Sequence, residues 1–159
     1  MFRVGFGQDS HRFSDDKNRL LTLGGIKIEG EVGLLGNSDG DVIIHAICRA
    51  IEQAIGGESF SVYADKKCGA GILDSKKYLE ISLENAKQKG YSINNLGISI
   101  EARKPRVDLI AAEMKRTLAK IMNIELSRIG ISATSGENLT PFGKGEGIQA
   151  FAIISLIKK

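Results

Sequence analysis

The only two histidines of the chain, His11 and His45, are its best candidates for chemistry. His11 follows Asp9 by two residues, directly after an apolar stretch that contains glycines. In extended backbone, residues i and i+2 point to the same face with Cα atoms about 6–7 Å apart, so Asp9 and His11 can converge on one point. One carboxylate and two imidazoles, with a fourth position open, are a typical ligand set of catalytic zinc. On spacing alone the alternatives stay open, because an Asp-x-His tripeptide is common by chance and a helical histidine is more often packed than metal-bound.

Asp41 lies four residues before His45, in a stretch with the pattern of an amphipathic helix. Side chains at i and i+4 share one face of a helix. A ligating histidine commonly has a carboxylate partner on its other ring nitrogen. We therefore expect Asp41 to orient the His45 ring.

Three further segments have the composition of phosphate-binding sites. Residues 36–38 (Gly-Asn-Ser) precede the N-terminus of the expected helix, where backbone N–H groups can hold an anion. Residues 134–137 (Thr-Ser-Gly-Glu) place small donors beside a carboxylate, which suits a phosphate that carries a divalent ion. Residues 103–106 (Arg-Lys-Pro-Arg) resemble a phosphate clamp. Taken alone, these segments are more often a capped loop (36–38), a plain glycine-rich loop (134–137) and a solvated charge cluster (103–106).

The elements that must position these residues alternate between strand and helix patterns. Strands are expected over 2–7, 20–28 (a hairpin split at Gly24–Gly25), 96–102, 129–133 and 148–157. Helices are expected from near Asp39 to Gly56, from Asp74 or Ser75 to Lys89, and over 107–121, with a long loop over 58–73. This order predicts an α/β (α+β-like) fold in a single domain, residues 1–159, with a four-stranded mixed sheet, helices on one face and a small hairpin.

Composition excludes several classes of protein. A chain of 159 residues suits one domain, and 42% hydrophobic with 26% charged residues is ordinary globular usage. A net charge of +3 is too balanced for a nucleic-acid-binding protein, and no apolar run is long enough to span a membrane. The two cysteines, Cys48 and Cys68, form no disulfide framework. Without a secretory leader we expect a cytoplasmic protein, although a removed transit peptide for a plastid-type organelle would leave no trace.

Five motifs occur together in one order: GQDSHRF (7–13), GLLGNSDGDVIIHA (33–46), LDS (73–75), ATSGE (133–137) and GKGEGI (143–148). From Arg3 to the last strand the chain closely resembles the 2-C-methyl-D-erythritol 2,4-cyclodiphosphate synthase family. The resemblance implies a homotrimer with active sites between neighbouring subunits. It also implies cyclisation of 4-diphosphocytidyl-2-C-methyl-D-erythritol 2-phosphate with release of CMP, in the non-mevalonate isoprenoid pathway.

The resemblance also assigns roles to residues of this chain. Asp9, His11 and His45 match the zinc ligands, and Glu137 matches a carboxylate that holds a second divalent ion, Mg²⁺ or Mn²⁺, on the diphosphate. Asn37 and Ser135 match positions that assist phosphoryl transfer. The implied substrate-binding set is Asp9, His11, Asn37, Ser38, Glu58, Asp65, Ala102, Arg103, Lys104, Pro105, Arg106, Thr134, Ser135, Gly136, Glu137 and Lys144.

The chain departs from the family pattern at several of these positions. Asn37 stands where a histidine is usual, so this side chain can donate a hydrogen bond but carries no positive charge. Ser135 replaces a threonine, and Lys144 replaces an arginine and loses its planar fork. In residues 57–68, which correspond to the loop that binds the methylerythritol part, only Gly57, Asp65 and in part Glu58 keep the pattern. Two other functions therefore remain open: a metal-dependent phosphohydrolase, and a nucleotide- or metal-binding homologue that has lost turnover.

Overall fold

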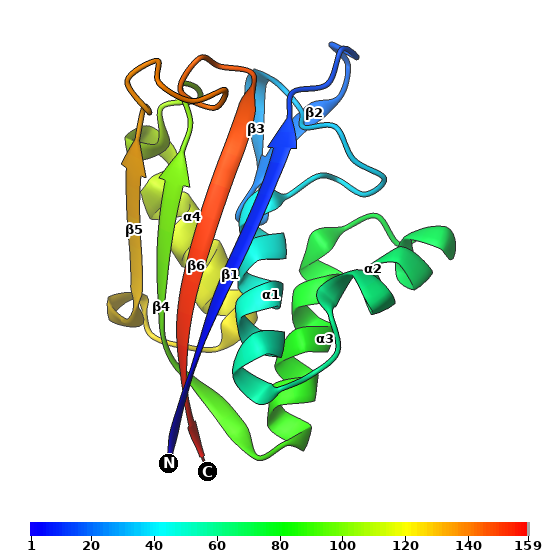
Figure 1. The fold of residues 1–159 in the computed structure, drawn as a ribbon, viewed down its shortest axis with the longest axis vertical. Coiled ribbons are helices and arrows are strands. Elements are labelled where there is room, and N and C mark those ends of the chain that lie inside the picture. Colours follow the sequence, from blue (N-terminus) through cyan, green and yellow to red (C-terminus); the bar gives the residue numbers. More distant parts are fainter. Residues whose placement is uncertain (159) are drawn as a thin grey trace.

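The computed structural model describes residues 1–158, and its centre is a four-stranded mixed sheet (Figure 1). The strand order is β1 (Phe2–Arg12), β6 (Gly147–Lys158), β4 (Tyr91–Glu101), β5 (Ile129–Thr134). β6 is antiparallel to both β1 and β4, and β5 is parallel to β4. β1, β4 and β5 therefore end at the same end of the sheet. The predicted α/β fold with a mixed sheet of four strands is confirmed.

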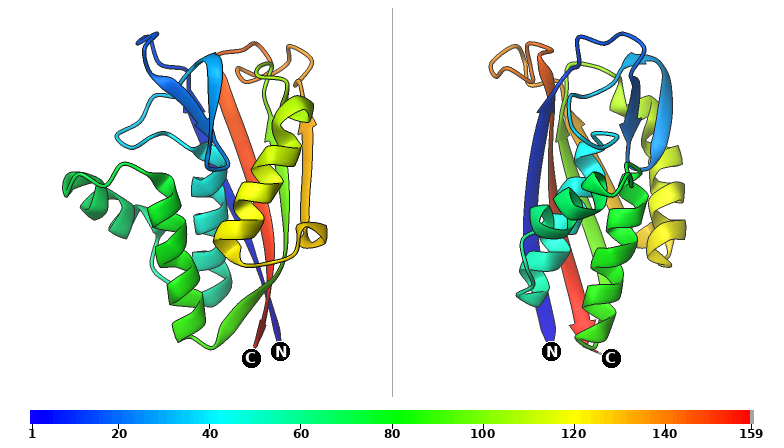
Figure 2. Two further views of the ribbon diagram at one scale, coloured as in Figure 1. Left: turned by 180° about the vertical axis from the view of Figure 1, so that it is seen from behind. Right: turned by 90° about the vertical axis from the view of Figure 1, so that its right-hand side faces the viewer.

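Helices cover one face of this sheet and leave the other face bare (Figure 2). The covering helices are α1 (Val42–Ile55), α3 (Ser75–Gln88) and α4 (Val107–Met122), and a short 3-10 turn (Leu126–Arg128) precedes β5. The predicted hairpin is also present as β2 (Leu20–Leu23) and β3 (Ile26–Val32), whose turn residues Gly24 and Gly25 both have positive φ. Among residues 1–158, no helix has the length and apolar character needed to cross a membrane.

Helix α1 lies directly against strand β1 because two glycines of the strand face it. A Cβ atom on Gly5 would lie 1.9 Å from the backbone oxygen of Ala50, and one on Gly7 would lie 2.0 Å from that of Ala46. Only glycine permits so close an approach. The contact brings the side chains of the first half of α1 level with the end of β1.

The bare face of the sheet carries large apolar side chains. Phe6 on β1 and Ile153 on β6 are 51% and 53% exposed, and Phe2 and Val4 are more exposed still. The Phe6 ring stacks on Phe151 with ring centroids 5.8 Å apart. Such a contiguous apolar surface is typical of an interaction face.

Several details differ from the sequence-based expectations: β1 continues to Arg12 rather than ending at residue 7, and β4 begins at Tyr91 rather than at residue 96. The segment 58–73, expected as a loop, contains the helix α2 (Phe60–Gly69), in which only Phe60 and Ala64 are buried. Two buried positions are too few to show a period in the sequence, and tertiary contacts such as that of the Phe60 ring with Tyr78 hold the helix in place. The first long helix begins at Val42 rather than near Asp39, since Asp41 is its N-cap.

Candidate functional site

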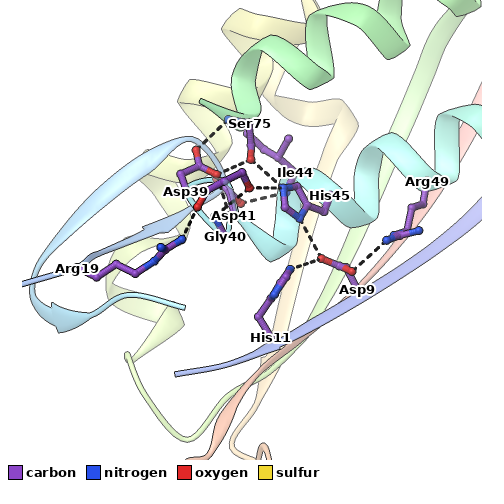
Figure 3. Close-up of polar contacts among 11 residues, drawn as sticks. Asp9, His11, Arg19, Asp39, Gly40, Asp41, Ile44, His45, Arg49 and Ser75 are labelled. Atoms are coloured by element: carbon purple, nitrogen blue, oxygen red, sulfur yellow. Dashed lines mark hydrogen bonds and ion pairs between the residues drawn. The ribbon is translucent and has the colours of Figure 1, made fainter. Parts of the chain in front are cut away.

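Asp9, His11 and His45 converge on one point (Figure 3). Asp9 and His11 lie on the same face of β1, and His45 is in the first turns of α1. Asp9 Oδ2 lies 2.9 Å from His11 Nε2 and 3.1 Å from His45 Nδ1. One ligand atom from each residue lies within 4.8 Å of the others. The structure thus brings together the three residues that the sequence singled out.

The electrostatics of this cluster favour charged groups. Burial opposes ionisation of Asp9, but the contacts with His11 and His45 outweigh it and hold the pKa of Asp9 well below its usual range. The Asp9 carboxylate in turn raises the pKa of His11 against the effect of burial. Within residues 1–158, the buried His11 Nε2 has no well-aligned hydrogen-bond partner despite its distance to Asp9. A carboxylate oxygen and two imidazole nitrogens that face one point fit a zinc ion with an open fourth position.

Asp41 does not orient the His45 ring, so this prediction is wrong. Its Oδ1 accepts hydrogen bonds from the backbone N–H groups of Gly24 and Ile44, and its Oδ2 accepts one from Gly25. The reason is that Asp41 sits at the N-cap, where the side chain turns back to the helix end instead of along the helix face. Burial raises the pKa of Asp41 to about 6.

The partner of His45 is instead Ser75, the first residue of α3 (Figure 3). His45 Nε2 lies 2.8 Å from Ser75 Oγ and 3.4 Å from Ser38 Oγ. Ser75 in turn donates hydrogen bonds to Asp39 from both its hydroxyl and its backbone N–H group. Sequence reasoning missed Ser75 as a contact of the ring, and Asp39 as the partner of Ser75, because Ser75 reaches the ring from a different helix.

The cluster lies in the wall of a cavity of about 240 Å³. Asn37 and Ser38 line it from the loop before α1, and Asp65 and Cys68 line it from α2. Cys68 Sγ donates to the backbone oxygen of Asn37 over 3.2 Å, which ties the two walls together. Three of the residues expected to contact substrate therefore border one cavity with the cluster: Asn37, Ser38 and Asp65.

Arg49 is a residue of this cavity that sequence reasoning missed. Its Nη2 lies 3.5 Å from Asp9 Oδ1, and its guanidinium carbon lies 5.1 Å from the centre of the Phe60 ring. It follows His45 by four residues and so shares its face of α1, which was the signal available in the sequence. Asp9 thus faces the histidines with one oxygen and Arg49 with the other.

Most of the remaining predicted residues lie in a second cluster at the ends of β4 and β5. Ser135 and Glu137 are exposed there with side-chain oxygens 3.4 Å apart, and Arg103 donates to the side chain of Asn138 over 2.6 Å. Thr134 Oγ1 accepts from the Gly136 N–H group. None of these residues lines the cavity of the three ligands. β6 and β4 lie between the two edge strands, and three strand spacings of about 4.8 Å separate those edges by roughly 14 Å.

The positions around this second cluster are mixed in character. Ala102 and Pro105 are buried, whereas Arg103, Lys104, Arg106 and Lys144 are exposed. Lys104 Nζ lies over the Phe13 ring, and Arg106 forms an ion pair with Asp108. Glu58 is separate from both clusters: it lines a neighbouring hollow beside Phe6 and Gln53.

Comparison with known proteins identifies the family and agrees with the fold. The profile of the YgbB family matches residues 2–157. The 2-C-methyl-D-erythritol 2,4-cyclodiphosphate synthase of Chlamydia muridarum is 39% identical over 160 aligned residues, which cover 99% of this chain and 89% of that protein. The enzyme of the same name from Chlamydia abortus is 38% identical, with 99% and 90% covered.

Two solved structures are also similar. A CDP complex of IspF from Plasmodium falciparum has a TM-score of 0.87 and 31% identity, and the match covers 99% of this chain and 97% of that one. The bifunctional IspDF of Campylobacter jejuni has a TM-score of 0.91 and 28% identity, covering 100% of this chain and 43% of that one. Because the family profile matches nearly its whole length and solved structures share its fold, this chain belongs to the YgbB family.

Proposed function

We propose that this protein is a 2-C-methyl-D-erythritol 2,4-cyclodiphosphate synthase, a phosphorus–oxygen lyase of the non-mevalonate isoprenoid pathway. The observation that carries the proposal is the convergence of Asp9, His11 and His45 beside an open cavity, in a chain that matches synthases of that name over nearly its whole length. The substrate is 4-diphosphocytidyl-2-C-methyl-D-erythritol 2-phosphate, and the products are the cyclic diphosphate and CMP.

Asp9, His11 and His45 hold a zinc ion in this proposal, and Glu137 holds Mg²⁺ or Mn²⁺ together with the substrate diphosphate. Bound there, the ions supply Lewis-acid stabilisation of the charge on the phosphate oxygens. In the reaction, an oxygen of the 2-phosphate forms a bond to the β-phosphorus while the bond from that phosphorus to the CMP oxygen breaks. The attacking group is already anionic near neutral pH, so the residues of the chain need not act as a general base.

The side chains of the protein position the reacting groups. Asn37 and Ser135 donate hydrogen bonds to phosphate oxygens, and Ser38, Thr134 and Gly136 hold the diphosphate. Ala102–Arg106 and Lys144 bind the cytidine end, and Asp65 and Glu58 bind the methylerythritol end. Holding the two phosphates in contact is worth on the order of 7–11 kcal/mol of the barrier.

A homotrimer with active sites between neighbouring subunits completes the proposal. Two observations support it: the metal cluster and the Ser135–Glu137 cluster lie at opposite edges of one sheet, and the bare face of that sheet is apolar. A neighbouring copy can supply the second cluster to the first. We place the enzyme in the cytoplasm, or in a plastid-type organelle, with no nucleic-acid or membrane partner.

Incubation of the zinc-loaded protein with the cytidyl substrate tests this function. CMP together with the cyclic diphosphate supports the synthase. A linear hydrolysis product identifies a metal-dependent phosphohydrolase instead, and an unchanged substrate identifies a binding homologue without turnover.

His45→Ala provides the sharpest mutational test of the metal site. We expect the variant to lose bound zinc, measured by elemental analysis, and to lose turnover by at least about 1,000-fold, because two ligands leave the ion weakly held. Circular dichroism should show an intact fold, since the ring lies at the cavity wall. Full activity without bound metal would refute the assignment.

A further inference from the structure

We infer that Ser75 and Asp39 position His45 by fixing its tautomer, so that Nδ1 is the nitrogen offered to the metal. Both residues lie behind the ring, on the side away from Asp9 (Figure 3). The inference rests on the proposed metal site and extends it to two residues that do not touch the ion.

Asp39 determines the direction of the Ser75 hydroxyl proton. Its side chain accepts three hydrogen bonds: from the Ser75 N–H group at 2.9 Å, from the Asp41 N–H group at 3.1 Å, and from the Ser75 hydroxyl. A carboxylate is an acceptor only, and three donors directed at it match that state. The single proton of the Ser75 hydroxyl is therefore committed to Asp39.

Ser75 in turn determines which ring nitrogen of His45 carries a proton. Because the Ser75 proton points to Asp39, Ser75 Oγ can only accept from His45 Nε2 at 2.8 Å, so Nε2 carries a proton. Ser38 Oγ, 3.4 Å away, is a weaker second acceptor for the same proton. In the neutral ring Nδ1 then has a lone pair, and this lone pair faces Asp9 Oδ2 at 3.1 Å. Two lone pairs directed at each other are satisfied by a cation between them, which is either a second ring proton shared with Asp9 or the metal ion.

Burial protects the hydrogen bond between Ser75 and His45 from exchange with water. Ser75 is 0% exposed and His45 is 6% exposed, so water does not replace the hydrogen bond between them. Ser75 begins α3, Asp39 lies in the loop before α1, and His45 belongs to α1. The orientation of one metal ligand therefore depends on how α3 docks onto α1.

The presence of only two histidines makes the tautomer directly measurable. In zinc-loaded protein labelled with 15N-histidine, we expect a slowly exchanging proton on His45 Nε2 and a metal-shifted Nδ1. Ser75→Ala should speed exchange of that proton and weaken zinc binding, measured by chelator competition, by about 10- to 100-fold. Asp39→Asn should weaken it as well, because the amide can donate to Ser75 Oγ and turn the hydroxyl proton toward His45 Nε2.

Ser82→Ala is the matched control, since Ser82 is another fully buried serine of α3 and its hydroxyl contacts Tyr63 rather than His45. Its zinc affinity should stay within about twofold of the parent protein. Metal on His45 Nε2, or parental zinc affinity in both Ser75→Ala and Asp39→Asn, would overturn the inference while leaving the synthase intact. A parent protein that binds no zinc would overturn the metal site itself, and with it this role of Ser75.

Discussion

Arg49 carries the only fixed positive charge among the described side chains that line the metal cavity. Asn37, which also lines this cavity, cannot carry a charge. We therefore expect the Arg49 guanidinium to bind a substrate phosphate while it keeps its contact with Asp9. Arg49→Met should raise KM about tenfold with a smaller effect on kcat, since a hydrogen bond to a charged group contributes about 1.5–3 kcal/mol.

Arg116→Met is a suitable comparison for that variant, because Arg116 is exposed on α4 and does not line the cavity. Steady-state kinetics of both proteins, at equal zinc content, separate substrate binding from metal binding. An unchanged KM in Arg49→Met would mean that Arg49 serves Asp9 alone.

The coupled pair Asp9 and His11 predicts a pH dependence with a definite sign. The folded pKa of Asp9 is lowered, so its stabilisation is present above the unfolded value of 3.8 and is lost as pH falls through the folded value. The folded pKa of His11 is raised, so its stabilisation is present below the unfolded value of 6.5 and is lost as pH rises through the folded value. In metal-free protein the pair stabilises the fold most between those two values.

Stabilisation of the fold by bound zinc should instead increase as pH rises above that range, because a proton on His11 competes with the ion. We expect the rise in Tm on adding zinc to be larger at pH 8 than at pH 6, with Tm of the metal-free protein measured in a chelator at each pH. Equal shifts at both values would show that His11 does not bind the ion.

For single residues, the sequence predicts the site correctly where spacing along the chain alone determines which side chains lie close together. Asp9 and His11 converge as their spacing in extended backbone predicts. Asp41 was assigned to His45 by helical spacing, but its place depends on which residue begins the helix, and that boundary is not visible in the pattern. Ser75 was beyond reach for a different reason, since its contact with His45 exists only after α3 docks on α1.

The packing of α1 on β1 determines whether the ligands meet at all. Gly7→Ala would place a Cβ 2.0 Å from a backbone oxygen of α1, which neither element can avoid without shifting. We expect the free energy of unfolding to fall by about 3 kcal/mol and zinc affinity to fall with it, because the shift separates His45 from Asp9. Chemical denaturation and chelator competition measure the two effects.

Gly130→Ala is the matched strand glycine, since an added Cβ there meets no atom within 4 Å. It should leave zinc affinity unchanged and unfolding free energy equal or up to about 1 kcal/mol higher. Similar losses of zinc affinity and unfolding free energy in both variants would show that the close contact of Gly7 with α1 does not position the metal ligands.

The long elements follow from their periodicity, whereas α2 does not. Leu79 and Met114 belong to apolar stripes that the sequence displays, and both are fully buried. In α2, by contrast, the exposed Asp65 and Val62 interrupt the pattern, and the helix is held by neighbours such as the Ser82 hydroxyl, which contacts Tyr63. A helix stabilised mainly by tertiary contacts has little signal in its own sequence.

Over the whole molecule, the predicted site residues fall into two clusters that one chain does not bring together. The metal cluster is at the β1 edge, and Ser135 and Glu137 are at the β5 edge. The motifs in the sequence predict the residues of both clusters. They do not predict the distance between the clusters, because that distance depends on the order of the strands in the sheet. Assembly through the bare face would therefore be part of catalysis in this protein.

Ile153→Asp separates assembly from metal binding. Ile153 is at the centre of the bare apolar face, on the inner strand β6, and a carboxylate buried there without a partner costs about 3–5 kcal/mol per subunit. We expect sedimentation to show a monomer that still binds zinc through its own Asp9, His11 and His45 but has lost cyclisation. Leu126→Asp, at an exposed position in the turn before β5, should remain trimeric and active. A monomeric Ile153→Asp variant with full activity would mean that each chain brings its two clusters together alone, against the separation imposed by β6 and β4.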